Sequence, residues 1–106
     1  MEGFDIQSLD DVIHGRIRLG VMAYLVGAGT ADFSVLRAQL GATDGNLSAH
    51  LRKLEEAGYI AVEKSFRDRK PVTSLTLTEA GRSAFLTYLD SISKLVRQGT
   101  QEKPEQ

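Results

Sequence analysis

The sequence contains no cysteine, no tryptophan and only two prolines. Without cysteine, disulfides, thiolate metal sites and thiol redox chemistry are excluded. No run of apolar residues approaches the roughly 20 that a membrane-spanning helix needs, and the acidic first residues lack the pattern of a signal peptide. We therefore expect a cytoplasmic protein that is not inserted in a membrane.

The chain also lacks an excess of charge of either sign, because 13 Lys and Arg residues are balanced by 14 Asp and Glu residues. Any nucleic-acid binding must therefore come from a local cluster of cations. The length of 106 residues and a hydrophobic content of 42% are typical of one soluble domain. We expect a single domain over residues 1–106, with its core over about residues 10–81.

Motifs for catalysis and for binding a cofactor or metal are missing as well. Gly27-Ala28-Gly29-Thr30 has neither the spacing nor the lysine of a phosphate-binding loop. His14 and His50 are the only histidines, too few for a histidine metal cluster. Ser48 and His50 are two positions apart on a predicted helix and cannot face each other as nucleophile and base. We predict no catalytic residues, no metal site and no cofactor.

Helical periodicity is present three times before residue 58. The predicted helices run from about Leu9 to Val26, from Asp32 to Leu40 and from Thr43 to about Ala57. Asp32 is expected to cap the second of them, and Thr43 or Asp44 the third. After Gly58 the apolar residues alternate with period two, which predicts two strands, around Ile60–Val62 and Leu75–Leu77.

The third predicted helix has one apolar face and one polar face. Leu47, Leu51 and Leu54 share a face and should pack inward. The opposite face is small and polar at its start and cationic further on: Gly45, Asn46, Ser48, Ala49, Arg52, Lys53 and Glu56. Small residues let a helix approach a DNA groove, and arginine can bind guanine or phosphate. Solvation alone also explains a polar face, so the context decides between the two readings.

That context is the charged segment Phe66–Pro71 between the two strands, which suits an exposed hairpin loop. Its cations Arg67, Arg69 and Lys70 can reach a minor groove or the phosphate backbone. Asp68 is expected to brace an arginine rather than to touch DNA. The alternative is a charged tip that only prevents edge-to-edge pairing of strands.

The last predicted helix covers about residues 79–97, is capped by Thr78 and precedes a polar tail, 99–106, that we expect to be disordered. Its apolar arc is wider than one small core requires. Together with the N-terminal arm it supplies candidate dimer contacts: Phe4, Leu9, Phe85, Tyr88, Leu89, Ile92, Leu95 and Val96. Packing within one chain is the alternative; we favour a two-fold homodimer that reads half-sites roughly 34 Å apart.

Two segments resemble a known family: TDGNLSAHLRKLEEAGYI over Thr43–Ile60 and LTLTEAG over Leu75–Gly81. With the helices around them, they are similar to the winged-helix DNA-binding domains of bacterial and archaeal MarR/ArsR-type transcriptional regulators. The resemblance implies an α+β fold, mainly α with a small β-hairpin. In this winged helix-turn-helix, a three-helix core carries a wing and is followed by a C-terminal dimerisation helix.

The resemblance also implies which residues contact DNA. The recognition helix in the major groove would use Thr43, Asp44, Gly45, Asn46, Ser48, Ala49, Arg52 and Lys53. The wing, on the minor groove or backbone, would use Arg67, Arg69 and Lys70. One departure concerns the wing: Lys70 stands where the family pattern has arginine, and one extra residue precedes Leu77-Thr78. The bracing of the wing is therefore expected to differ from that of typical relatives.

The function that follows is a sequence-specific transcriptional regulator, a homodimer that binds double-stranded DNA and represses by occluding a promoter. Many relatives respond to a small molecule, but no effector follows from this sequence. The alternative function is a winged-helix protein–protein interaction module without DNA binding, which the net charge of −1 permits. An enzyme is not expected.

Overall fold

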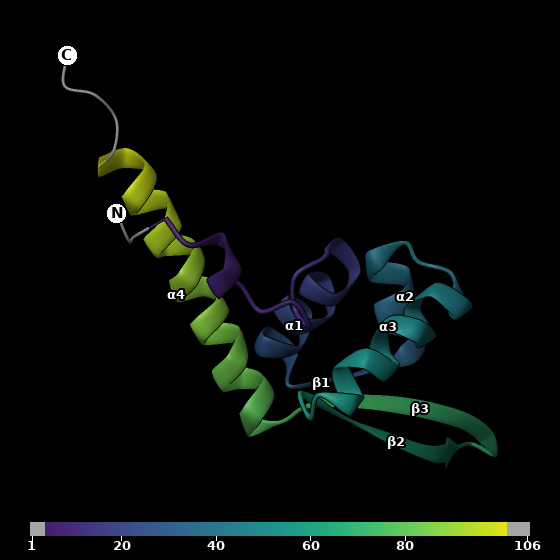
Figure 1. Cartoon of the computed structure of the whole chain (residues 1–106). Coiled ribbons are helices and arrows are strands. Elements are labelled where there is room, and N and C mark those ends of the chain that lie inside the picture. The colour runs from purple at the N-terminus through teal and green to yellow at the C-terminus, as the bar shows by residue number, and fades with distance from the viewer. Residues whose placement is uncertain (1–3, 102–106) are drawn as a thin grey trace.

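A computed structural model describes residues 4–101 of the chain. Within them, four α-helices and a three-stranded antiparallel sheet are arranged as a winged helix-turn-helix (Figure 1), which confirms the predicted α+β class. The order is η1 (Ile6–Ser8), α1 (Arg16–Ala28), β1 (Thr30–Asp32), α2 (Phe33–Leu40), α3 (Asp44–Glu56), β2 (Ile60–Arg67), β3 (Lys70–Leu77) and α4 (Glu79–Gln101).

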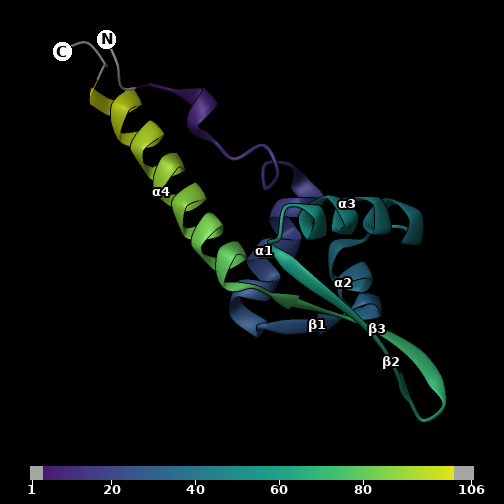
Figure 2. The ribbon, with the colours of Figure 1, turned by 60° about the horizontal axis from the view of Figure 1, so that its bottom comes forward.

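The sheet places a hairpin beside the helices. β3 is the central strand, flanked by β1 on one side and β2 on the other. The β2–β3 register runs from Ile60 opposite Leu77 to Arg67 opposite Lys70, whereas β1 pairs only with residues 74–76 of β3. The distal half of the hairpin therefore has no third strand, and it projects beyond the helices (Figure 2).

The hairpin is longer than the sequence predicted. Phe66 and Pro71 were assigned to an exposed loop, but they pair with each other as strand residues. Only Asp68 and Arg69 form the turn, with φ of 54° and 67°. Positive φ at both central residues is the geometry that matches the twist of a two-residue hairpin. The short strand β1 was not predicted, because three residues are too few to show a period of two.

Helix α1 begins later than predicted, because a local turn replaces its first residues. The Asp10 carboxylate accepts a hydrogen bond from the backbone N–H of Val12 at 2.8 Å, and the Asp10 carbonyl accepts one from His14 N–H at 2.8 Å. Gly15 then has a φ of 133°, which interrupts any continuous helix. The prediction of a helix from Leu9 was therefore wrong.

Helix α4 is longer than predicted, since it continues to Gln101. The expected disordered tail from Gly99 was therefore wrong for residues 99–101, and the rest of that tail, 102–106, lies outside the described residues. The predicted cap is confirmed: Thr78 Oγ1 accepts a hydrogen bond from Gly81 N–H at 2.9 Å. The Thr78 hydroxyl also donates to the carbonyl of Gly58 at 2.7 Å, which joins α4 to the end of α3.

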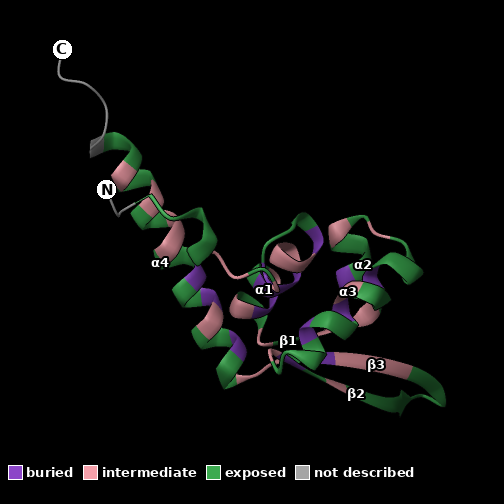
Figure 3. Cartoon of the chain, viewed as in Figure 1, coloured by how far each residue is buried: buried purple, intermediate pink, exposed green. Residues whose placement is uncertain are grey.

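The core lies where α1, α2, α3, the sheet and the first half of α4 meet (Figure 3). Leu47, Leu51 and Leu54 are 0%, 5% and 0% exposed, which confirms that this face of α3 packs inward. Phe85 and Tyr88 are also in this core, with 6% and 2% of their surface exposed. Their prediction as dimer contacts is corrected, because these two side chains are buried within their own chain.

Tyr59 connects α3, α4 and the segment before α1. Its carbonyl accepts a hydrogen bond from Thr78 N–H at 3.1 Å, and its hydroxyl donates to the Asp10 carboxylate at 2.6 Å. That hydrogen bond, together with burial and the charge of Asp10, raises the pKa of Tyr59 to about 12. Gly81, in the first turn of α4, packs directly on the Tyr59 backbone, where a Cβ would overlap the carbonyl oxygen.

The segment before α1 is also attached to α4, beside which it runs in Figure 2. The hydroxyl of Tyr88 and Nδ1 of His14 are 2.8 Å apart. Burial, and to a smaller extent the charge of Asp10, raises the pKa of Tyr88. Near the far end of α4, the ring of Phe4 lies 3.9 Å from the position that a Cβ on Gly99 would take.

The Gly81–Tyr59 contact leads to a stability prediction. We expect Gly81→Ala to lower the free energy of unfolding by about 1–3 kcal/mol, the usual cost of overpacking, although alanine itself favours helix by about 1 kcal/mol. Gly27→Ala in α1 is the matched control, because a Cβ there meets nothing within 4 Å. Urea unfolding followed by circular dichroism should show opposite changes for the two variants; equal changes would contradict the proposed overlap.

Candidate nucleic-acid interface

The outer face of α3 is open to solvent along its whole length. All eight residues predicted for the recognition helix are exposed: Thr43, Asp44, Gly45, Asn46, Ser48, Ala49, Arg52 and Lys53. Burial of the leucine face accounts for this, since residues on the other side of the helix must point outward. The first half of this face has no large side chain, so a partner can approach the helix backbone closely.

The first turn of α3 is fixed by two interactions. Thr43 Oγ1 accepts a hydrogen bond from Asn46 N–H at 3.1 Å, which confirms Thr43 as the cap. Asp44 forms an ion pair with Arg37 of α2, with Nη1 and Oδ1 at 2.5 Å. The Asp44 charge next to the recognition surface is therefore balanced within the chain. Arg37 was not recognised from the sequence, because nothing in the pattern shows that it meets Asp44.

A hollow of about 460 Å³ separates α3 from the hairpin. Its lining consists of Phe33, Ser48, Leu51, Arg52, Glu55, Val62, Lys64, Thr73 and Leu75. Arg52 on α3 and Lys64 on β2 thus line the same hollow from opposite walls. Lys64 is a candidate DNA contact that sequence analysis missed. The signal was available, because Lys64 follows Val62 with the period of two that puts both on one face of the strand.

The wing cations Arg67, Arg69 and Lys70 are exposed at the end of the hairpin. Arg67 is held by Asp32, with Nη1 donating to Oδ2 at 2.9 Å. The prediction that Asp68 braces an arginine was wrong, since Asp68 takes part in no ion pair among residues 4–101. Asp32 precedes α2, where it was expected to cap the helix, but it makes no capping hydrogen bond because its carboxylate is turned toward Arg67.

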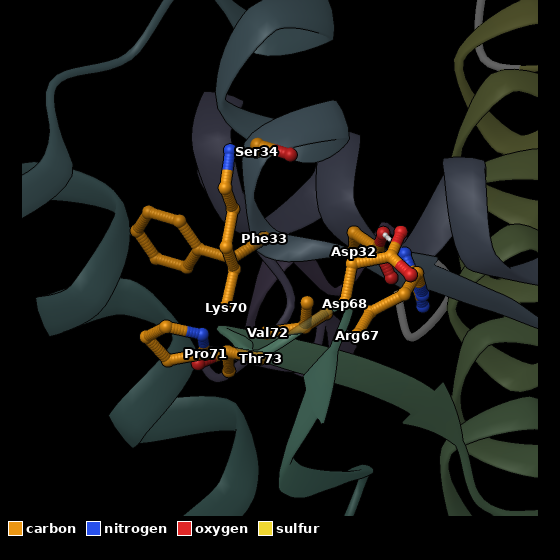
Figure 4. A pocket seen from close by; sticks show the side chains of 9 residues that line it. All are labelled: Asp32, Phe33, Ser34, Arg67, Asp68, Lys70, Pro71, Val72 and Thr73. Atoms are coloured by element: carbon orange, nitrogen blue, oxygen red, sulfur yellow. Dashed lines mark hydrogen bonds and ion pairs between the residues drawn. The ribbon is translucent and has the colours of Figure 1, made fainter.

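The Asp32–Arg67 pair lies at one side of a second hollow, of about 480 Å³, between the start of α2 and the hairpin. In Figure 4 the Arg67 side chain reaches Asp32, while Lys70 points toward Ser34 at the start of α2. The hydroxyl of Ser74 on β3 also donates to Asp32, at 3.4 Å. Asp32 therefore links the base of α2 both to the central strand and to the end of the wing.

Several charged side chains of α3 and the hairpin lie outside the ion pairs of the chain. Among residues 4–101, Asp44 and Asp32 are neutralised by Arg37 and Arg67. Five cations of α3 and the hairpin take part in no ion pair within the same residues: Arg52, Lys53, Lys64, Arg69 and Lys70. They run from the recognition helix across the hollow to the wing tip. Four acidic residues of the same elements are likewise outside these ion pairs, namely Glu55, Glu56, Glu63 and Asp68. The surface of α3 and the hairpin therefore carries a small excess of unpaired positive charge, five cations against four anions.

A separate apolar surface lies on α4. Leu86, Leu89 and Val96 are 55%, 46% and 64% exposed, and their spacing of three and seven residues puts them on one side of the helix. Leu9 and Ile92, also predicted for a dimer interface, are partly buried against the core, and Leu95 is intermediate. Phe4 is 57% exposed. The far half of α4 extends beyond the helical core, with only the N-terminal segment beside it (Figure 1).

In the described residues, no His, Asp and Glu side chains form a group of three or more that could hold a metal ion. Among residues 4–101, every helix is too short or too polar to span a bilayer.

Comparison with known proteins gives one family. A family model described as a winged helix DNA-binding domain matches residues 17–96. An uncharacterized protein of Methanocaldococcus jannaschii is 36% identical over 84 residues, which cover 79% of this chain and 91% of that protein. The two sequences thus match over most of both chains.

Solved structures are similar over the same region. The structure of a transcriptional regulator homologue from Pyrococcus horikoshii has a TM-score of 0.77 and 31% sequence identity, covering 82% of this chain and 86% of that one. Reduced AbfR bound to DNA has a TM-score of 0.66 at 21% identity, covering 79% of this chain and 58% of AbfR. At this identity, the similarity to AbfR shows a shared fold and no more.

The Asp32–Arg67 pair predicts a measurable titration. Because the hydrogen bond from Arg67 lowers the pKa of Asp32, the ion pair stabilises the folded chain above the ordinary Asp range and is lost as pH falls through the lowered pKa. We expect carboxyl ¹³C NMR to show Asp32 titrating below ordinary aspartates, and Arg67→Gln to raise its pKa. Arg69→Gln is the matched control; an unchanged Asp32 pKa in Arg67→Gln would show that the pair does not form.

Proposed function

The chain belongs to the family of winged helix DNA-binding domains, and from this premise we propose that it is a sequence-specific transcriptional regulator that binds double-stranded DNA as a homodimer. The observation that carries the proposal is the set of unpaired cations extending from α3 across the hollow to the wing. These cations would supply the phosphate contacts, although the local excess over the unpaired acidic residues is small and the net charge of the chain is −1.

Helix α3 and the hairpin, on the two sides of the hollow, suit different grooves of a DNA duplex. An α-helix fits the major groove, and base contacts come mainly from the N-terminal part of a recognition helix. In α3 that part holds the small and polar residues, with Asn46 and Ser48 able to hydrogen-bond base edges and Arg52 able to bind guanine or phosphate. The projecting hairpin then reaches the neighbouring minor groove or backbone with Arg69 and Lys70.

We propose that α4 forms the dimer interface through Leu86, Leu89 and Val96. These exposed side chains lie on a helix that extends beyond its own core, and association would remove their apolar surface from water. Two chains related by a two-fold axis would present two recognition helices to successive turns of one DNA face. Bound over a promoter, such a dimer represses by occlusion, and it acts in the cytoplasm, where the promoter is accessible.

Binding of the purified protein to the DNA upstream of its own gene tests the proposed function. We expect specific binding, tighter than to an unrelated fragment and weaker at the higher of two salt concentrations. Arg52→Ala should weaken binding by roughly 1–3 kcal/mol and reduce the salt dependence by about one phosphate contact. Lys94→Ala, an exposed cation on α4 that pairs with Asp90, is the control and should change neither.

Equal, weak binding of the wild-type protein to both fragments would contradict the regulator and favour a protein–protein interaction module. Unchanged affinity of Arg52→Ala, with specific binding by the wild type, would remove only Arg52 from the interface. The two results therefore separate the function from the assignment of one residue.

The dimer is tested by placing a charge on the apolar side of α4. Leu89→Glu should convert the dimer to a monomer in sedimentation equilibrium at micromolar concentration, because two buried carboxylates at the interface cannot be compensated. Thr87→Glu adds the same charge at an exposed position on the other side of α4 and should leave the dimer intact. A wild-type protein that sediments as a monomer would exclude this interface.

A further inference from the structure

Phe66 is an apolar side chain in a place where neither the core nor the α4 surface explains it. It is 75% exposed, the highest value among the large hydrophobic side chains that the structure describes as exposed. It lies one residue from the end of β2, on the projecting half of the hairpin, and pairs across the strands with Pro71. At this position the side chain is available to a partner of the projecting hairpin.

The register shows which way Phe66 points. Residues of a strand alternate between its two faces, so Ile60, Val62, Lys64 and Phe66 share one face of β2. Their partners on β3 are Leu77, Leu75, Thr73 and Pro71. Ile60 and Leu75 of this face are buried in the core, and Lys64 and Thr73 line the hollow opposite α3. Phe66 and Pro71 therefore continue the face that looks toward the recognition helix.

The opposite face of the hairpin has a different role. Arg67 and Lys70 lie on it, and Arg67 is tied to Asp32. That ion pair attaches the end of the wing to the start of α2, which limits how far the projecting strands can move. Pro71 has a fixed φ and stiffens the strand next to Phe66. The aromatic ring is thus presented by a braced hairpin rather than by a loose loop.

The charges around Phe66 indicate the chemistry of the partner. Lys64 precedes it on the same face, and Arg69 follows in the turn beside Asp68; none of the three is ion-paired within residues 4–101. An apolar ring between Lys64 and Arg69 is complementary to a minor groove, whose floor and sugar walls offer apolar contact between two rows of phosphates. Proteins that bind minor grooves use Phe and Pro as apolar wedges in this setting.

We propose that Phe66, backed by Pro71, is the apolar contact of the wing with DNA, and that it packs in the minor groove next to the site read by α3. This inference rests on the proposed function and goes beyond it, because it assigns the wing a non-ionic contribution to affinity. Such a contact favours sequences whose minor groove is easily deformed, and so contributes specificity without hydrogen bonds to bases.

The ionic and apolar contributions can be separated by salt dependence. Phe66→Ala should weaken binding to the upstream DNA by roughly tenfold, in the range of an aromatic contact with bases, and should leave the slope of log K against log salt unchanged, because it removes no charge. Arg69→Ala should reduce that slope by about one. Ser65→Ala, next to Phe66 but on the opposite face, is the matched control and should bind as the wild type does.

A second measurement uses the absence of tryptophan from the chain. Phe66→Trp introduces a single fluorophore at the wing, and specific DNA should change its emission and protect it from iodide quenching. Thermal unfolding checks that each variant folds; an exposed side chain at the tip should affect the melting temperature little.

The outcomes distinguish failure of the proposed regulator function from failure of the apolar wing contact alone. If the wild-type protein does not bind the upstream DNA specifically, the proposed function fails. If the wild type binds, but Phe66→Ala binds equally well and the Phe66→Trp emission does not respond to DNA, the apolar wing contact is overturned while the regulator stands. A loss of affinity in Phe66→Ala with an unchanged salt slope supports the contact.

Discussion

Burial of one face of α3 is the constraint on which the rest of the surface depends. Leu47, Leu51 and Leu54 are almost completely buried among α1, α2 and the sheet, and full burial of such a side chain contributes on the order of 1.5–3 kcal/mol. Rotation of the helix about its axis would expose them. The direction of Ser48 and Arg52 is therefore decided by the core, and the recognition surface needs no further interaction to be oriented.

Burial also decides the orientation of the hairpin side chains, because strand residues alternate between two faces. Ile60 and Leu75 are buried in the core, and the pairing register then dictates which face every later residue of the strands occupies. A slip of one residue would turn Lys64 and Phe66 away from α3. The ion pair between Asp32 and Arg67 acts at the other end, where no core is available to hold the strands.

The sequence was sufficient for elements whose signal is local. The leucine spacing identified α3, and the alternation identified the parts of both long strands next to the core. Thr78 was recognised as a cap, and Thr43 was one of two candidates for the other cap. What escaped prediction depends on contacts between distant residues. Asp32 and Arg67 are 35 positions apart, and an apolar stripe on a helix does not reveal that Phe85 and Tyr88 face their own core while Leu89 does not. The late start of α1 came from Asp10, whose side chain offers the backbone a turn instead of a helix.

The contact between Gly81 and the Tyr59 carbonyl sets the direction in which α4 leaves the core. It joins the end of α3 to the start of α4 without a flexible linker, and α4 has 23 residues, or about 34 Å at 1.5 Å per residue. Over that length a tilt of about 10° at the first turn displaces the far end by about 6 Å. In the proposed dimer, a small change in the tilt of α4 at Gly81 would therefore change the distance between the two recognition helices.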